Sequence, residues 1–129
     1  MNAESPAVDG PPRMILKLEG FALFVLCLYA YAKLGYSWWL FGALIFAPDL
    51  GMVGYLKNAR LGAQLYNTFH ITALPIGIGA WGYAWSEPLA LAIALIWLAH
   101  IGMDRMLGYG LKYETGFADT HLGRIGKEN

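Results

Sequence analysis

The chain has 129 residues, of which 57% are hydrophobic and only 14% are charged, and its formal net charge is zero. An ordinary soluble domain carries about 25% charged residues, so this composition favours a single domain that is buried in a membrane. The zero net charge offers no electrostatic attraction to nucleic acid, and we expect no nucleic-acid partner.

Four apolar segments predict four transmembrane helices. Residues 1–13 are polar, contain three prolines and are predicted to form a flexible tail. The helices are expected at residues 14–35, 38–56, 61–85 and 88–107, each close to the ~20 residues that an α-helix needs to cross a bilayer. Residues 108–129 form a C-terminal tail. Because short connections make neighbours antiparallel, the predicted fold class is all-α, a four-helix transmembrane bundle. Pro48 and Pro75 predict kinks inside two spans.

The basic residues are distributed very unequally between the two ends of such a bundle. The end that holds both termini carries eight of the nine Lys and Arg residues, namely Arg13, Lys17, Lys57, Arg60, Arg105, Lys112, Arg124 and Lys127. The opposite end carries only Lys33, together with a belt of tryptophan and tyrosine residues. Positive charge marks the cytoplasmic side of membrane proteins. We therefore expect a protein of the cell (inner) membrane with both termini in the cytoplasm and membrane lipids as its partners.

Ionisable residues coincide in depth on three of the four helices. At about 1.5 Å per residue, Asp49, His70 and His100 lie roughly 10–14 Å inside the cytoplasmic boundary. Asp104 lies four residues after His100 and therefore shares its helix face. Ionisable residues in membrane helices face the bundle interior, so these side chains should meet in a pocket open to the cytoplasm. A shallower layer on the same side contains Glu19, Tyr66 and Asn67.

This combination of side chains is typical of a metal site. Imidazole nitrogens and carboxylate oxygens are good ligands for Zn²⁺, Mn²⁺ or Fe²⁺. The predicted metal ligands are Asp49, His70, His100 and Asp104. Glu19 or Tyr66 would act as the catalytic acid or base, and Asn67 would be a supporting polar group. With an open coordination position, such a metal activates water. The leading prediction is thus a metal-dependent hydrolase acting on a lipid-like substrate.

Two other classes of function fit the same residues. Carboxylates and histidines inside a bundle also form proton relays, with Glu19 and Asp49 as the exchanging acids of a small homo-oligomeric transporter. The polar groups stop halfway across the membrane, however, and leave no outer half-channel. In a structural or partner-binding bundle the polar core would only fix helix register. The sequence does not name the substrate.

The C-terminal tail is predicted to be solvated. In the alternative, Tyr113, Phe117 and Leu122 fold the tail back over the mouth of the pocket, and His121 becomes a minor candidate for the site.

Several long motifs carry a family resemblance. The stretches "LGYSWWLF", "APDLGMVGYL", "GAQLYNTFH" and "AHIGMDRMLGYGLKY", followed by "THLGRIG", resemble the bacterial family catalogued as domain of unknown function 4260. The resemblance runs from about residue 16 to residue 126. It implies a small multi-pass membrane protein of bacteria and brings no catalytic role with it. A looser similarity to membrane-bound metal-dependent hydrolases also exists, but Asp49 stands alone where that class has tandem aspartates.

Overall fold

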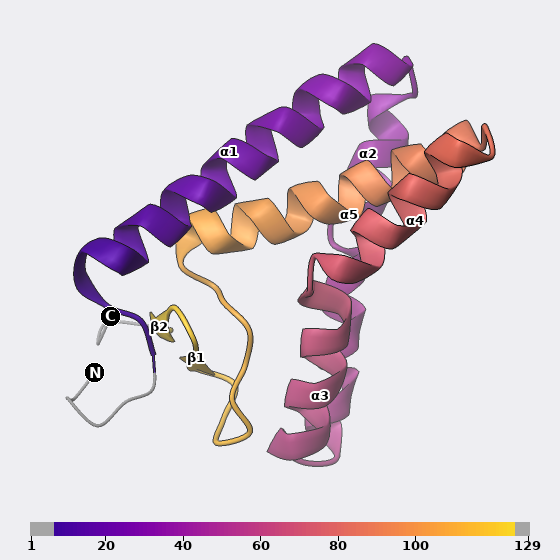
Figure 1. Ribbon diagram of the computed structural model, residues 1–129. Coiled ribbons are helices and arrows are strands. Elements are labelled where there is room, and N and C mark those ends of the chain that lie inside the picture. Colours follow the sequence, from indigo (N-terminus) through magenta and orange to yellow (C-terminus); the bar gives the residue numbers. More distant parts are fainter. Residues whose placement is uncertain (1–6, 126–129) are drawn as a thin grey trace.

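The structure is a computed structural model that describes residues 7–125, and the chain is all-α apart from one small hairpin (Figure 1). The helices are α1 (Gly10–Leu34), α2 (Trp38–Leu44), the 3₁₀-helix η1 (Ala47–Leu56), α3 (Ala59–His70), α4 (Ala73–Ala84) and α5 (Pro88–Leu107). Strands β1 (Asp119–Thr120) and β2 (Gly123–Arg124) form an antiparallel hairpin. The predicted all-α helical fold is confirmed. The first six residues of the predicted N-terminal tail, and Lys127 among the basic residues, lie outside the described part.

The first helix begins inside the segment that was predicted to be a tail. Pro11 and Pro12 occupy the first turn of α1. A proline is well suited to this position, because the first turn of a helix needs no N–H donors and favours the fixed φ of proline. The helix ends at Gly35, whose φ of 79° is left-handed and whose N–H bonds the carbonyl of Ala32.

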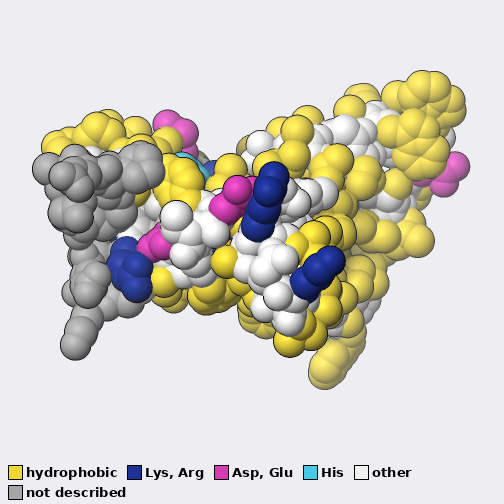
Figure 2. Space-filling model, turned by 90° about the horizontal axis from the view of Figure 1, so that it is seen from below, with side chains coloured by type: hydrophobic (Ala, Val, Ile, Leu, Met, Phe, Trp, Pro, Cys, Tyr) yellow, Lys and Arg dark blue, Asp and Glu magenta, His cyan; other side chains and the backbone are white. Residues whose placement is uncertain are grey.

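Among residues 7–125, three segments are long and apolar enough to cross a membrane: Gly10–Leu34, Trp38–Leu56 and Pro88–Leu107. Large apolar side chains lie on the outside, and Trp39 is 90% exposed and Leu56 88% exposed. So much exposed apolar surface is expected of a lipid-facing protein. Figure 2 shows the molecule from below, where charged side chains lie across the middle of the face and hydrophobic side chains cover most of the part that extends to the right.

The third predicted span is divided into two helices instead of one kinked helix. The chain leaves α3 after His70, and Ile71 is extended with ψ of 143°. Pro75 explains the break, because its ring clashes with a helical carbonyl four residues earlier, which belongs to Ile71. Pro75 is instead placed in the first turn of α4, where it is tolerated.

The second span changes from α2 to the 3₁₀-helix η1 halfway along its length. Pro48, Gly51 and Gly54 are its buried residues and recur every third position. A 3₁₀-helix has three residues per turn, so these residues form one narrow face. That face packs against α3 so closely that a Cβ at Gly54 would lie 2.8 Å from the carbonyl oxygen of Leu61.

The helices form two packing units. In one unit α5 packs between α1 and α4, and in the other η1 packs against α3 (Figure 1). The crossing of α1 and α5 requires glycine, because a Cβ at Gly102 would lie 2.8 Å from the carbonyl oxygen of Gly20. The apolar core of the first unit contains Cys27, Tyr31, Ile45, Ala92, Ile96 and Ala99.

The C-terminal tail is folded over the rest of the molecule through residue 125, which differs from the predicted solvated tail. Leu122 is fully buried. Its carbonyl accepts a hydrogen bond from the Arg13 guanidinium on α1, and the N–H of Val8 bonds the carbonyl of His121. Lys112 pairs with Thr120 in an isolated bridge. The tail is ordered because it buries apolar side chains and satisfies its backbone groups against α1 and α3.

Candidate metal centre

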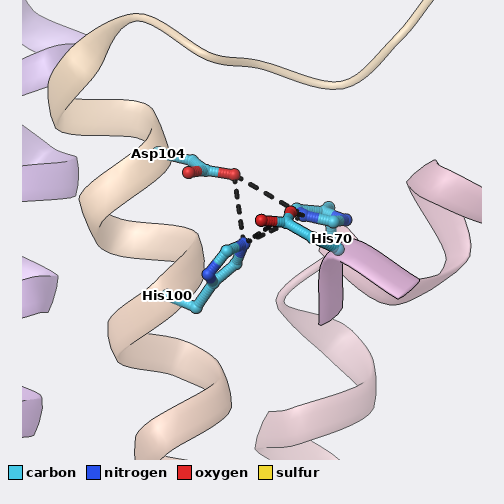
Figure 3. A group of neighbouring side chains, drawn as sticks. His70, His100 and Asp104 are labelled. Carbon is cyan, nitrogen blue, oxygen red and sulfur yellow. Dashed lines mark hydrogen bonds and ion pairs between the residues drawn. The ribbon is translucent and has the colours of Figure 1, made fainter. Parts of the chain in front are cut away.

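The four predicted ligands come together at one point between the two packing units. His100 and Asp104 project from successive turns of α5, and His70 is the last residue of α3 (Figure 3). Asp49 comes from the first turn of η1. Both histidines and Asp104 are buried, at 2%, 0% and 7% exposure respectively, whereas Asp49 is half-buried.

The distances between the ligand atoms match those of a small coordination shell. The Nε2 atoms of His70 and His100 are 3.1 Å apart. Asp49 Oδ1 lies 3.2 Å from the first and 3.1 Å from the second. Asp104 Oδ2 lies 3.5 Å and 3.3 Å from the same two nitrogens. A tetrahedron with metal–ligand distances of about 2.0–2.1 Å has edges of roughly 3.3–3.4 Å. All four ligand atoms lie within 4.8 Å of one another.

Hydrogen bonds within the cluster cannot satisfy these atoms together. His70 Nδ1 lies 2.7 Å from the carbonyl oxygen of Tyr66, to which it donates its proton. In the neutral ring Nε2 then carries a lone pair, and this lone pair faces two carboxylates. One proton on His100 Nε2 could serve only one of its three neighbours, whereas a cation at the centre attracts all four groups. An outer hydrogen bond that orients the imidazole in this way is common in metal sites.

Tyr66 contacts the cluster through both its ring and its hydroxyl group. Its ring stacks on the ring of His70, with centroids 3.7 Å apart and planes 9° apart. Its hydroxyl donates to Asp104 Oδ2 over 3.3 Å. Tyr66 thus contacts one histidine and one carboxylate of the ligand set and lines the adjoining cavity.

Asn67 and Glu19 do not lie where the sequence predicted them, in a shallow polar layer beside the cluster. The side chain of Asn67 binds the backbone of Lys112, with its amide donating to the Lys112 carbonyl at 2.8 Å and its oxygen accepting the Lys112 N–H at 2.6 Å. Glu19 is exposed on α1 and lines a separate cavity of about 190 Å³, together with Arg105 and His121. The structure therefore does not bring Glu19 into the group of four candidate ligands.

Arg105 has a role that its place at the end of a span did not indicate. A basic residue there usually reaches the lipid headgroups. In the structure Arg105 Nη2 donates to the backbone carbonyl of His70 over 3.0 Å. This carbonyl has no helical partner because α3 ends there. Arg105 thereby fixes the end of the helix that carries one of the four ligands.

The family comparison agrees with the motifs. A family model described as domain of unknown function (DUF4260) matches residues 13–125. The chain belongs to this family. Comparison with curated proteins gave no match, and comparison with solved structures gave none either.

This DUF4260 chain has a cavity of about 500 Å³ beside the cluster. Asp49 and Asp104 form part of its wall, as do Tyr66 and Lys112. Apolar side chains from η1, α5 and the tail supply the rest, among them Met52, Leu107 and Phe117. A ligand in this cavity would meet the carboxylates at one end and hydrocarbon surface elsewhere.

Lys112 is the site residue that sequence reasoning missed in this DUF4260 chain. It counted only as one of the basic residues at the cytoplasmic end, yet it is only 4% exposed. Its Nζ lies 3.7 Å from the ring centroid of Phe117 and 4.7 Å from that of Tyr66. Burial lowers the pKa of its ammonium group from 10.5 to about 8, against the opposing attraction of Asp104 and Asp49. No local sequence signal distinguishes Lys112, because its burial depends on the path of the tail.

Proposed function

We propose that this protein is a multi-pass protein of the cell membrane, with cytoplasmic termini, that binds one divalent metal ion and hydrolyses a lipid-like substrate. Asp49, His70, His100 and Asp104 would hold the metal. The observation that carries the proposal is that five of the six distances among these four donor atoms are 3.1–3.5 Å, which is close to a tetrahedral edge, and that all four atoms lie within 4.8 Å of one another. The distribution of basic residues supports the proposed orientation.

The hydrolytic part of the proposal rests on the adjoining cavity. A metal ion bound there would need a further coordination position, open to the cavity, for a water, and it would then lower the pKa of that water and polarise the bond to be cleaved. The water oxygen would then bond to the electrophilic carbon or phosphorus, the bond to the leaving oxygen would break, and the proton given up by the water would pass to that oxygen. Tyr66, whose hydroxyl lies beside Asp104 on the cavity wall, is placed to hold that proton. Glu19 lines a different cavity and has no part in this scheme.

The first experiment is to measure the metal content of the detergent-purified protein by mass spectrometry after reconstitution with Zn²⁺, Mn²⁺ or Fe²⁺. Asp49→Asn and His100→Ala each remove a ligand, and Glu87→Gln is the matched control, because Glu87 is an exposed carboxylate before the start of α5. We expect nearly one metal per chain in the native protein and the control, and little in the two ligand variants.

Native protein that binds none of the three metals would contradict the proposal. The cluster would then be better explained as a proton relay, which net proton uptake into proteoliposomes would test. If the protein binds metal but hydrolyses no ester or phosphate ester amphiphile, the metal site is supported and the proposed hydrolase activity is refuted.

A further inference from the structure

Lys112 is a buried cation that has no carboxylate bound to it among residues 7–125. Its ammonium lies over the rings of Tyr66 and Phe117, and none of the ion pairs among the described residues includes it. Burying a charge without a partner is costly, although aromatic rings offset part of the cost. Lys112 lines the cavity of about 500 Å³ that Asp49 and Asp104 also line. An anion that enters this cavity would supply the missing partner.

The charges of the site set the charge of the ligand. Two carboxylates balance a divalent cation, two neutral imidazoles add nothing, and Lys112 leaves one positive charge. The cavity therefore favours an anion of about one charge. Lysine is a common partner of phosphate groups in proteins.

The apolar part of the cavity wall indicates what the uncharged part of the ligand is. Met52, Leu107 and Phe117 are among the apolar residues of the same cavity. A free polar anion would not use this surface, whereas a hydrocarbon chain would bury against it. A fatty carboxylate would supply the charge but has no bond for water to cleave. In a phosphate ester the charged group is also the electrophile.

We propose that the cavity binds a phosphate ester carried by an amphiphile, with the phosphoryl oxygens between the metal centre and the Lys112 ammonium and the hydrocarbon against the apolar wall. This inference rests on the proposed function and names the substrate class of the same site. Lys112 is then the residue that selects an anionic substrate.

The test measures binding, so that it does not depend on turnover. Full-length protein in neutral detergent is loaded with Mn²⁺, and its metal content is measured first. Dihexyl phosphate is then titrated, and broadening of its ³¹P signal by the bound Mn²⁺ reports the phosphorus close to the centre. Inorganic phosphate and hexanol are titrated separately, the first by the same signal and the second by competition with dihexyl phosphate.

Three variants isolate the charge of Lys112. We expect Lys112→Gln to weaken binding of dihexyl phosphate by at least about tenfold, as the loss of a charge-assisted contact would. Lys112→Arg keeps the charge and should bind within a few-fold of the native protein. Lys57→Gln removes an exposed lysine of the same membrane domain and should bind unchanged. Inorganic phosphate and hexanol should each bind at least about tenfold more weakly than dihexyl phosphate.

Three results would overturn the inference while the metal site stands. In the first, Lys112→Gln retains its metal and binds dihexyl phosphate as tightly as the native protein. In the second, inorganic phosphate binds as tightly as dihexyl phosphate, which makes free phosphate the ligand. In the third, Lys112→Arg binds as weakly as Lys112→Gln, which makes the role of Lys112 structural. Native protein that takes up no metal would instead refute the proposed function itself, and the initial metal measurement separates that case.

Discussion

The side chain of Asn67 on α3 helps to hold the tail over the cavity, and this contact gives a quantitative prediction. Asn67→Ala removes both hydrogen bonds to the backbone of Lys112, which are 2.8 Å and 2.6 Å long. A buried backbone group that loses its partner costs about 1–3 kcal/mol. These two bonds are only partly buried, and water would replace some of each. We therefore take the low end, about 1 kcal/mol for each bond, and expect a loss of about 2 kcal/mol in the free energy that keeps the tail closed.

This loss of free energy increases the fraction of molecules in which the tail is open. At 1.4 kcal/mol per factor of ten, about 2 kcal/mol raises the open fraction roughly 30-fold. Trypsin cleaves after lysine, and the bond after Lys112 is protected because that residue is only 4% exposed. When opening and closing are faster than cleavage, the cleavage rate follows the open fraction. The rate of cleavage after Lys112, followed by mass spectrometry, should therefore rise roughly 30-fold in Asn67→Ala.

Gln64→Ala is the matched control, because Gln64 lies one turn earlier on α3 and its amide makes an exposed bond of 3.3 Å to Glu114. We expect its cleavage rate to stay within about twofold of the native rate, since an exposed bond contributes little. If Asn67→Ala is cleaved after Lys112 no faster than this control, the tail is held closed by something other than Asn67 and the reasoning is wrong.

Three further predictions concern the metal, the helix crossing and Lys112. A metal present at 100 times its dissociation constant should stabilise the folded protein by about 2.7 kcal/mol, which thermal denaturation would detect as a raised Tm that Asp49→Asn lacks. Gly102→Ala should lower the Tm by several degrees, because the added Cβ would lie 2.8 Å from the carbonyl oxygen of Gly20, whereas Gly77→Ala, which has open space around it, should not. Binding of dihexyl phosphate should weaken as the pH rises through the lowered pKa of Lys112, about 8, and a titration of Lys112→Arg should show no such loss. The same lowered pKa means that the unfolded chain binds more protons between pH 8 and 10.5, so this residue makes the free energy of unfolding rise with pH in that window.

The Asp/His cluster could be predicted from the sequence because its residues lie inside regular apolar segments. Depth could be counted along each segment, and the spacing of His100 and Asp104 gave their common face. Only the rise and period of a helix are needed for this prediction. Asp49 and His70 lie at the predicted site even though η1 and the end of α3 depart from a regular α-helix.

The residues beyond the cluster were less accessible because their positions depend on long-range packing. Lys112 and Asn67 meet only because the tail returns to α3, and a glycine-rich tail carries no periodic signal of that path. The break after His70 shows a different difficulty, since Pro75 indicates a disturbance but not whether the helix bends or ends. The interval of three between Pro48, Gly51 and Gly54 was a readable sign of a 3₁₀ face.

The division of the helices into two packing units has a mechanical consequence. One unit, η1 with α3, supplies Asp49 and His70, and the other, which contains α5, supplies His100 and Asp104. A bound ion would thus be a cross-link between two bodies, whereas without it mutual repulsion of the two carboxylates would push them apart. The joints after α2 and after α3 are then natural hinges. Arg105 and Tyr66 also join α3 to α5, so we expect metal loss to leave each body folded and to loosen the angle between them without freeing it.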